Sequence, residues 1–218
     1  MAVSTNVLPE SFFTAPTLSV AQQLIGCMLI ATAADGSLSG GVIVETEAYP
    51  HDDPANHAYN GQTERNRTMF GPAGRFYVYR SYGLHWCCNV VTGPEGTGEA
   101  VLIRAVEPTV GLNAIAARRA KPATTHVRDL CGGPGRVSQA LGITRAHDGM
   151  QCDATALSLR PADALPGSAQ SRIVATHRIG ISKAQHRWYR FVDPQSPAYS
   201  GRRINIGIAD VRSTTRSG

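Results

Sequence analysis

The sequence predicts a single α+β domain, spanning residues 1–218, whose sheet is mainly antiparallel. Its 218 residues suit one large domain and can bury a real core. Segments of strand-like composition follow one another through short connections, which favours antiparallel pairing over βαβ units. No internal repeat, low-complexity tract or linker divides the chain. We expect residues 1–8 and 212–218 to be loose ends of this domain.

The first half of the chain supplies most of the predicted sheet. A helix is expected over residues 15–24, where apolar residues recur at helical spacing behind Pro16. Turn residues at 34–37 and 93–98 then separate strand-like runs. The polar segment 50–68 is expected to form an irregular loop. Strands are expected over residues 27–32, 41–47, 75–79, 85–92 and 100–106.

The second half is predicted to be mostly helix and loop. Helices are expected over residues 109–120 and 134–141, the latter because Pro134 suits a first helical turn and Gly142 a helix end. The remaining segments have weaker patterns. They are surface loops over residues 145–171 with one short strand at 157–159, and a strand-like segment over 173–181.

The charge balance favours a nucleic-acid partner. The chain has 21 basic and 16 acidic residues, a net charge of +5, and only Lys121 and Lys183 are lysines. Arginine matches phosphate oxygens bidentately, so the excess of arginine suits a phosphate-bearing partner. A base-composition bias in the gene explains the choice of arginine over lysine equally well. The net positive charge itself still favours a polyanion.

The cysteines and the chain's apolar pattern indicate the compartment. Five cysteines are an odd number, and they lack CxxC or Cys/His metal-binding spacing, so we expect reduced, partly buried thiols. The N-terminus shows no basic segment followed by an apolar stretch, and no run approaches the roughly 18 apolar residues of a membrane span. The sequence thus predicts a soluble intracellular protein of the cytoplasm, nucleoid or nucleus, with no membrane partner.

The strand over residues 44–49 (VETEAY) carries the most informative motif. Its alternation puts Glu45, Glu47 and Tyr49 on one face, with the two carboxylates roughly 7 Å apart. A comparable separation serves inverting glycosidases, while a single carboxylate that activates water is the simpler scheme. Structural ion pairs with Arg104 or another arginine would explain the same residues.

Aromatic residues and one histidine follow this motif. His57 lies in the polar loop, where a histidine is most often solvated. Tyr77 and Tyr79 share one strand face and fit either a core or a stacking platform. Tyr82 precedes Gly83 at a predicted hairpin turn, which exposes the ring. An aromatic side chain at such a tip can enter DNA at a base step.

Two polar segments have a composition that suits phosphate contacts. Residues 62–67 (QTERNR) could bind phosphate or simply form a solvated loop. Residues 132–136 (GGPGR) lead into the helix predicted over 134–141, and free amides at a helix N-terminus attract phosphate. This segment lacks the Lys-Ser/Thr pair of a nucleotide-binding loop, so a plain loop-to-helix turn explains it equally well.

Taken together, these segments resemble the alkyladenine DNA glycosylase family, also called 3-methyladenine or methylpurine DNA glycosylases. Each segment is weak alone, but their ordered combination is specific and extends over most of the chain. The matching segments are residues 44–49, 65–70, 77–83, Asn89, 102–108, 130–134, 139–141 and 178–181.

The resemblance implies both a fold and an activity. The fold is a single α+β domain around a curved, mainly antiparallel sheet with flanking helices, like the C-terminal domain of formyltransferases. The activity is that of a monofunctional DNA glycosylase in base excision repair, which flips 3-methyladenine, 7-methylguanine and possible further purines such as hypoxanthine out of duplex DNA. Hydrolysis of the N-glycosidic bond leaves an abasic site. The implied partner is double-stranded DNA with an alkylated or deaminated purine, bound by a monomer without cofactor or metal.

The resemblance also assigns roles in the site. Glu47 matches the general base that deprotonates the attacking water. Arg104 matches an arginine near that water and the DNA phosphate. Asn89 matches the residue that crowds the amino group of guanine. The pocket around the base is matched by Tyr49, His57 and Tyr79.

On the DNA-binding side, Tyr82 matches the side chain that fills the gap left by the flipped base. The sequence departs from the vertebrate member at two points: the interval from Tyr49 to His57 is one residue shorter, and His85 stands where that member has tyrosine. Further positions implied to contact DNA are Thr63, Met69, His85, Leu102, Gly135 and Arg136.

The residues suit this chemistry, although two other functions fit them as well. Alkylation at N3 or N7 makes the purine cationic, which favours an aromatic pocket and weakens the glycosidic bond. One carboxylate then suffices, so Glu45 is expected to be supporting or structural. No lysine is apparent as a nucleophile, so strand cleavage through a Schiff base is not expected. The alternatives are a protein that recognises distorted DNA without excision, and a sugar hydrolase that uses Glu45 and Glu47 as a pair.

Overall fold

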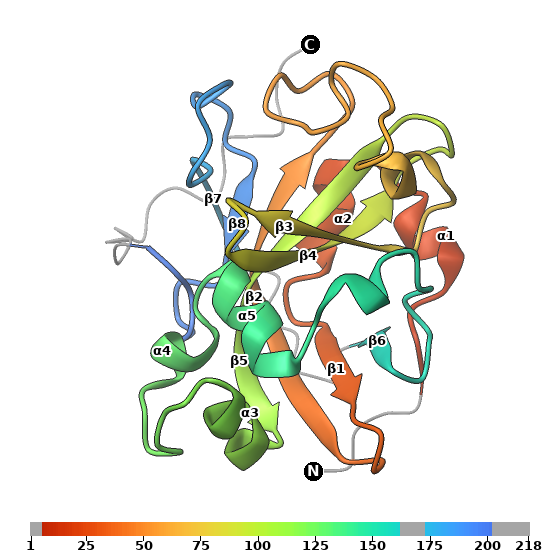
Figure 1. The fold of residues 1–218 in the computed structure, drawn as a ribbon. Helices are drawn as coiled ribbons and strands as arrows, with labels where there is room; N and C mark the ends of the chain where they lie inside the picture. The colour runs from red at the N-terminus through yellow and green to blue at the C-terminus, as the bar shows by residue number, and fades with distance from the viewer. Residues whose placement is uncertain (1–5, 162–172, 202–218) are drawn as a thin grey trace.

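The computed structural model describes residues 6–161 and 173–201 (Figure 1). Most of the predicted loose ends, residues 1–5 and 212–218, lie outside the described residues. Residues 162–171 of the predicted loop region also lie outside them. Within the described residues the chain is already anchored at Leu8, which is buried and whose amide donates to the Leu159 carbonyl over 3.1 Å.

The described chain forms one α+β domain around a curled, antiparallel half-barrel sheet with flanking helices, which confirms the predicted fold class (Figure 1). The strand order is β3-β4-β5-β2-β1-β6, while β8 pairs with both β2 and β7. The strands are β1 (Met28–Thr32), β2 (Leu38–Tyr49), β3 (Phe76–Ser81), β4 (His85–Thr92), β5 (Glu99–Val110), β6 (Leu157–Arg160), β7 (Val174–Thr176) and β8 (Arg190–Val192).

The long strand β2 organises the sheet. One edge pairs with β5, and the other pairs first with β1 and then, over Glu45–Glu47, with β8. Its register against β5 shifts between Gly40 and Gly41 and twice between Ile43 and Thr46. Bulges of this kind bend a strand and strengthen its twist. The segment Glu45–Glu47 is therefore held between two strands at the bend.

Short helices pack against the sheet. α2 contacts β2 and β5, whereas α5 contacts β4 and β5 (Figure 1). The main core lies between these layers and includes Leu24, Ile103 and Leu130, which are fully buried. The helices are α1 (Glu10–Phe13), α2 (Thr17–Gln23), α3 (Leu112–Arg118), α4 (Val127–Cys131) and α5 (Pro134–Leu141), with 3-10 turns at Arg67–Phe70 and Arg145–His147.

Several predicted boundaries were wrong because tertiary pairing overrides the local pattern. The helix expected from residue 109 begins only at Leu112, since β5 continues to Val110 to pair with Gly40, and Gly111 then turns the chain with φ +67°. The strand expected over 173–181 ends at Thr176. In contrast, β4 and α5 have the predicted bounds.

The cysteines are all buried, and no disulfide joins them. Burial raises the pKa of the Cys88 and Cys152 thiols. These side chains therefore behave as small apolar residues of the core. In the described part of the chain, no helix is long and apolar enough to cross a membrane.

Candidate active site

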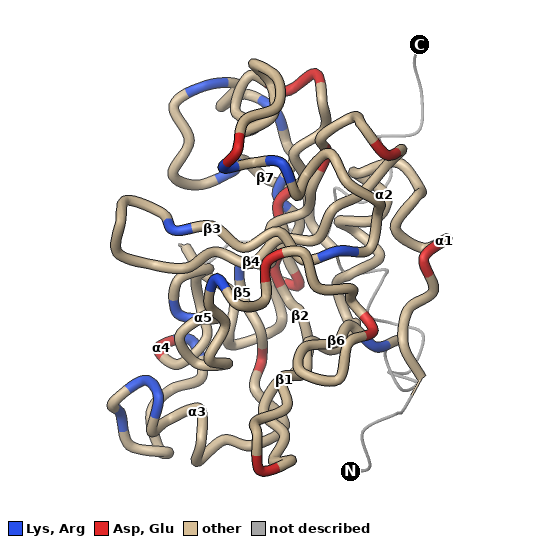
Figure 2. The backbone as a smooth tube through the Cα atoms, turned by 45° about the vertical axis from the view of Figure 1, so that its right-hand side comes forward, with Lys and Arg blue, Asp and Glu red and all other residues tan. Residues whose placement is uncertain are grey.

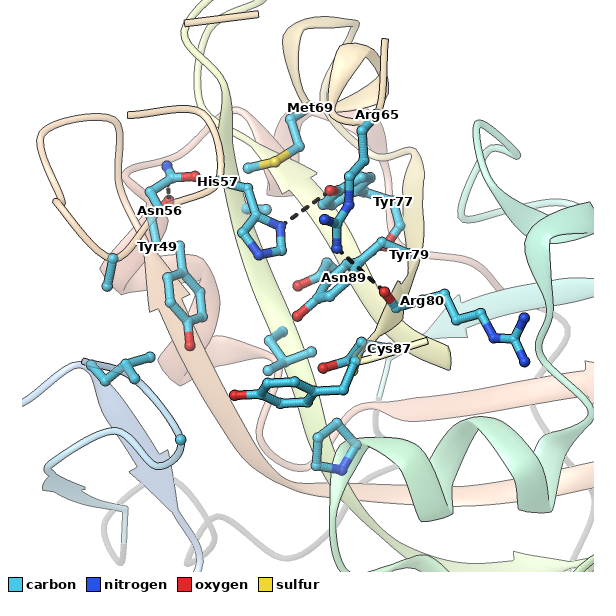
Figure 3. Close-up of a pocket in the computed structure, with 18 of the residues that line it drawn as sticks. Tyr49, Asn56, His57, Arg65, Met69, Tyr77, Tyr79, Arg80, Cys87 and Asn89 are labelled. Atoms are coloured by element: carbon cyan, nitrogen blue, oxygen red, sulfur yellow. Dashed lines mark hydrogen bonds between the residues drawn. The ribbon is translucent and has the colours of Figure 1, made fainter. Parts of the chain in front are cut away.

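A cavity of about 870 Å³ opens between the end of β2, the β3–β4 hairpin and the loop after β7 (Figure 3). This is the size range of sites for drug-sized ligands. Tyr49, His57, Tyr79, Tyr82, Asn89 and Arg104 line it, so the structure brings most of the sequence-predicted site residues together. Lys183, which the sequence did not suggest, also lines the cavity.

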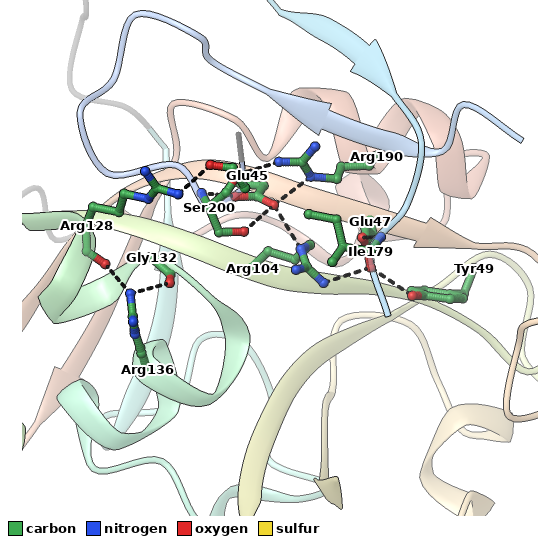
Figure 4. Close-up of polar contacts among 11 residues, drawn as sticks. Glu45, Glu47, Tyr49, Arg104, Arg128, Gly132, Arg136, Ile179, Arg190 and Ser200 are labelled. Atoms are coloured by element: carbon green, nitrogen blue, oxygen red, sulfur yellow. Dashed lines mark hydrogen bonds and ion pairs between the residues drawn. The ribbon is translucent and has the colours of Figure 1, made fainter. Parts of the chain in front are cut away.

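Glu47 lies directly behind the cavity floor. Its side chain is fully buried and does not line the cavity, but all three of its hydrogen-bond donors do. Oε2 accepts from the Tyr49 hydroxyl over 2.8 Å and from Arg104 Nη1 over 3.2 Å, and Oε1 accepts from the Ile179 amide over 2.8 Å (Figure 4). A carboxylate has about four acceptor positions, so one remains on Oε1.

Glu45 is fully buried and does not line the cavity. It accepts from Arg104 Nε over 2.9 Å, from Arg190 Nε over 2.7 Å, and from the Ser200 amide and hydroxyl over 2.5 and 2.8 Å (Figure 4). Three of these bonds end on Oε1 and one on Oε2. Both glutamates therefore take part in the structural ion pairing considered for them, and two guanidinium groups pair with Glu45.

The charges of this buried cluster balance. Two carboxylates, Glu45 and Glu47, share Arg104, and Arg190 adds a second guanidinium against Glu45. Burial opposes the charge of Arg104, but Glu47 and Glu45 raise the pKa of its guanidinium above the ordinary value. Such burial is tolerated because each charge has a partner, and removal of one partner would leave the other uncompensated.

Aromatic rings form the opposite wall of the cavity from Tyr49 (Figure 3). The rings of His57 and Tyr79 meet edge to face at 4.5 Å, and Tyr77 stacks on Tyr79 at 5.4 Å. The guanidinium of Arg65 lies 5.7 Å from the Tyr79 ring. The space between Tyr49 and this wall is therefore a slot that suits a planar ring.

Hydrogen bonds fix the slot from behind. His57 Nδ1 lies 3.2 Å from the Tyr77 hydroxyl. Burial, followed by the charge of Arg65, lowers the pKa of His57, which favours a neutral imidazole. The Asn89 amide donates to the Tyr77 carbonyl over 2.9 Å, which holds Asn89 at the floor. Tyr77, considered for either core or stacking platform, is buried and also lines the cavity.

The β3–β4 hairpin ends in an exposed aromatic tip at the cavity mouth. Tyr82 is 89% exposed, which confirms the predicted exposure at a turn. Its φ of +49° lies in the left-handed region, which is uncommon for a residue other than glycine. Leu84 beside it is 73% exposed. An apolar pair held out from the domain in this way indicates a partner surface.

The remaining predicted DNA contacts fall into two groups. Met69 and Leu102 are buried and line the cavity instead of the outer surface. Thr63 and His85 are exposed, and Gly135 packs directly under the His85 ring, where a β-carbon would lie 2.9 Å from His85 Cβ. Arg136 is half-exposed and donates to the Arg128 and Gly132 carbonyls over 3.1 and 3.4 Å, so it also ties α4 to α5 (Figure 4).

Basic residues flank the hairpin. Figure 2 shows Lys and Arg along the segment from α3 to α5 and on the loop after β7, below and above the projecting β3–β4 tip. That loop, residues 177–188, contains Lys183 and no acidic residue. The face that carries the cavity mouth is thus suited to a polyanion.

Sequence reasoning missed two contributors from the late part of the chain. Ile179 binds Glu47 through its backbone amide, which leaves no trace in the side-chain pattern. Arg190 lies on the short strand β8, whose three residues were too few for a strand to be predicted.

Comparison with known proteins gives a consistent match. The family profile described as "Methylpurine-DNA glycosylase (MPG)" matches residues 11–197. Relatives named "Putative 3-methyladenine DNA glycosylase" include one from Granulibacter bethesdensis, which is 46% identical over 93% of this chain and 92% of its own. A relative from Rhodopseudomonas palustris is 49% identical over 85% of this chain and 84% of its own. One from Methanoculleus marisnigri is 48% identical over 84% of this chain and 93% of its own.

Proposed function

Because the chain belongs to the methylpurine-DNA glycosylase family and is a DNA-3-methyladenine glycosylase, a hydrolase of N-glycosidic bonds, we propose that its cavity receives an alkylated purine flipped out of duplex DNA. Glu47 is the general base. The observation that carries this proposal is the carboxylate behind the cavity floor, held by three donors with one acceptor position left on Oε1.

The slot between Tyr49 and the His57–Tyr79 wall suits a purine with a positive charge. Aromatic faces attract cations, and a neutral His57 adds no repulsion. We therefore assign 3-methyladenine and 7-methylguanine as substrates. Neutral hypoxanthine is a further proposed substrate, which rests on the family resemblance and not on charge. Asn89, fixed to the Tyr77 carbonyl, is proposed to crowd the exocyclic amino group of guanine.

The reaction needs little acid catalysis. An alkylated purine leaves C1′ with its electron pair and becomes neutral, so the N-glycosidic bond breaks without a strong acid. Water bound at the free position of Glu47 gives its proton to the carboxylate and forms the new bond to C1′. Arg104 holds Glu47 in place, and the Glu47 carboxylate stabilises the oxocarbenium-like sugar. The products are a free base and an abasic site, and the scheme uses no metal or cofactor.

Tyr82 is proposed to enter the minor groove and fill the space left by the flipped purine. The exposed ring offsets part of the unstacking cost, which is a few kcal/mol. Met69 and Leu102 would contact the flipped nucleotide from the cavity wall. Thr63, His85, Gly135 and Arg136 would contact the flanking backbone. We propose that an intracellular monomer carries out this reaction.

We further propose that the enzyme is monofunctional, although Lys183 lines the cavity and carries a primary amine. A lyase would form a Schiff base between an amine and the abasic sugar, and borohydride would reduce it to a stable cross-link. We expect no cross-link between wild-type protein and abasic DNA. A cross-link that disappears in Lys183→Ala would overturn this part of the proposal.

The decisive experiment is single-turnover cleavage of duplex DNA containing 7-methylguanine or hypoxanthine by wild type and Glu47→Gln. Base release should collapse in the variant, while its binding to abasic-site DNA persists. Glu64→Gln is the matched control, because Glu64 is exposed and forms an exposed ion pair with the nearby Arg67. Retained excision by Glu47→Gln would refute the assignment.

The same assay distinguishes recognition without excision, because a wild type that binds lesion DNA but releases no base would support that alternative. The paired-carboxylate sugar hydrolase is disfavoured because Glu45 accepts four hydrogen bonds from Arg104, Arg190 and Ser200, and of these three donors only Arg104 lines the cavity.

A further inference from the structure

Arg178 lies behind the Tyr49 wall of the slot. Its side chain is 0% exposed and does not line the cavity, which Tyr49 does. The guanidinium lies 4.7 Å from the Tyr49 ring centre and 5.4 Å from that of Tyr189. A planar cation against aromatic rings is a geometry that arginine supports and lysine does not.

The edge of the same guanidinium joins both sides of the slot. Nη1 donates to the Ala48 carbonyl over 3.0 Å and forms a buried ion pair with Asp53. Asp53 lies in the loop that carries His57, where its carboxylate accepts from the Ala55 amide and its carbonyl from the Asn56 amide. Arg178 therefore connects the strand that bears Tyr49 to the loop that bears His57.

The next residue in the chain reaches the proposed general base. The Ile179 amide donates to Glu47 Oε1 over 2.8 Å. A shift of the Arg178 side chain would therefore move two features at once, the ring at the wall and the donor on the carboxylate. Because Ile179 also lines the cavity, such a shift would change the position of the Glu47 carboxylate relative to a bound substrate.

This arrangement is costly for stability. Nε and Nη2 of Arg178 are buried and have no hydrogen-bond partner among the residues that the structure describes. Buried donors without partners cost free energy, and a buried ion pair is often no better than apolar packing. A local violation of this kind typically accompanies a functional constraint.

On the basis of the proposed function, we propose that Arg178 is a positioning residue that fixes the Tyr49 ring and the Glu47 carboxylate for base excision. It acts through these two residues and does not touch the substrate. Its planar, charged form is required because the same group stacks against the rings and pairs with Asp53.

The neighbouring pair Arg187–Asp52 is a matched control. Arg187 lies 5.5 Å from the same Tyr189 ring and pairs with Asp52 over 3.3 Å, one residue before Asp53. However, the Asp52 side chain is 58% exposed. Among the residues that the structure describes, neither Arg187 nor Asp52 forms a hydrogen bond, ion pair or ring contact with Tyr49 or Glu47. A substitution here tests the loss of an arginine from the same region without loss of the proposed positioning.

The test measures single-turnover base release from duplex DNA containing 7-methylguanine for wild type, Arg178→Lys and Arg187→Lys. We expect a loss of about tenfold to a hundredfold for Arg178→Lys, since misplacement by about 1 Å can cost about 10²-fold. Arg187→Lys should change the rate by less than about threefold, as exposed pairs contribute little. Equal rates for wild type and Arg178→Lys would overturn the proposal.

A double variant covers the case in which Arg178→Lys fails to fold. Arg178→Met with Asp53→Asn removes both buried charges and keeps similar volumes, a replacement that is often neutral for stability. A folded double variant, verified by its thermal melt, should still lose about tenfold or more in rate, because the Tyr49 ring has lost its planar support. Wild-type activity in this variant would overturn the proposal.

A spectroscopic measurement separates this inference from the proposed function. In a Glu47→Gln background, the fluorescence of a 1,N6-ethenoadenine lesion should be quenched when its ring stacks in the slot. Adding Arg178→Lys should weaken that quenching, while Arg187→Lys should not, and identical quenching in both would count against positioning. If wild-type protein releases no base at all, the proposed function fails, whereas this measurement still tests the position of Tyr49.

Discussion

The hydroxyl of Tyr49 donates to Oε2 of Glu47 over 2.8 Å, so one side chain is both a wall of the slot and a ligand of the carboxylate behind it. The two residues are separated by one position on β2 and point to the same face. The fit of a ring against Tyr49 is thereby coupled to the orientation of the proposed base. Burial, followed by the charge of Glu47, raises the pKa of Tyr49 well above its ordinary value, which keeps the phenol a donor.

Tyr49→Phe should slow base release by about tenfold with little loss of lesion binding. The ring remains as a wall, but Glu47 loses one of its three donors, and hydrogen bonds to charged groups contribute about 1.5–3 kcal/mol. Single-turnover rates at saturating enzyme measure the chemical step, and a gel-shift titration measures binding. An unchanged rate would show that Arg104 and Ile179 orient Glu47 without help.

Glu45→Gln should act mainly on stability. The amide would leave Arg104 and Arg190 facing a neutral group in a buried site, and loss of one partner of a buried pair costs about 3–5 kcal/mol. Urea unfolding measures this loss, and Glu107→Gln, which affects a partly buried pair with Ser196, is a milder comparison. A fully stable Glu45→Gln variant with no activity would instead revive the paired-carboxylate mechanism.

Tyr82→Ala should weaken binding to lesion-containing duplex by about 1–3 kcal/mol, the range for one base–aromatic stack. Because the ring is 89% exposed, the free energy of unfolding should not change. Tyr59→Ala is the control, as Tyr59 is 48% exposed in the loop after β2 but does not line the cavity. Equal binding losses in the two variants would argue against a wedge at the hairpin tip.

The parts of the fold that could be predicted have strong local signals. β4 coincides with a strongly apolar run of residues. α5 has Pro134 in its first turn and is followed directly by Gly142 in a left-handed conformation. β8 has no such signal, because its three residues form a strand only through pairing with β2 and β7. The extra length of β5 likewise depends on a partner far away in the sequence.

The same distinction holds for the site. Glu47, Tyr49 and Arg104 carry recognisable side chains in recognisable segments, and the structure brings them together. The contact between Ile179 and Glu47 joins residues 132 positions apart through a backbone amide, so no residue type marks it. The burial of Arg178 behind Tyr49 is equally invisible in the sequence, since most arginines are exposed.

His57 should make both stability and activity fall on acidification. Burial, followed by the charge of Arg65, lowers its pKa in the folded protein below the unfolded value of 6.5. Below about pH 6.5 the unfolded chain therefore binds more protons, so stability is present above that pH and is lost as the pH falls towards the lowered folded pKa. His57→Gln should lose less stability over this window. The free energy of unfolding is measured against pH for both proteins, and the contributions of the other histidines cancel in the difference between the two curves.

Activity should follow the same direction for cationic substrates. A protonated His57 would place a positive charge across the slot from Tyr49, so release of 7-methylguanine should fall more steeply on acidification than release of neutral hypoxanthine. Arg65→Gln removes the second cause of the lowered pKa and should move this fall to higher pH. Rate–pH profiles that coincide for wild type, Arg65→Gln and His57→Gln would show that the imidazole does not titrate in contact with the substrate.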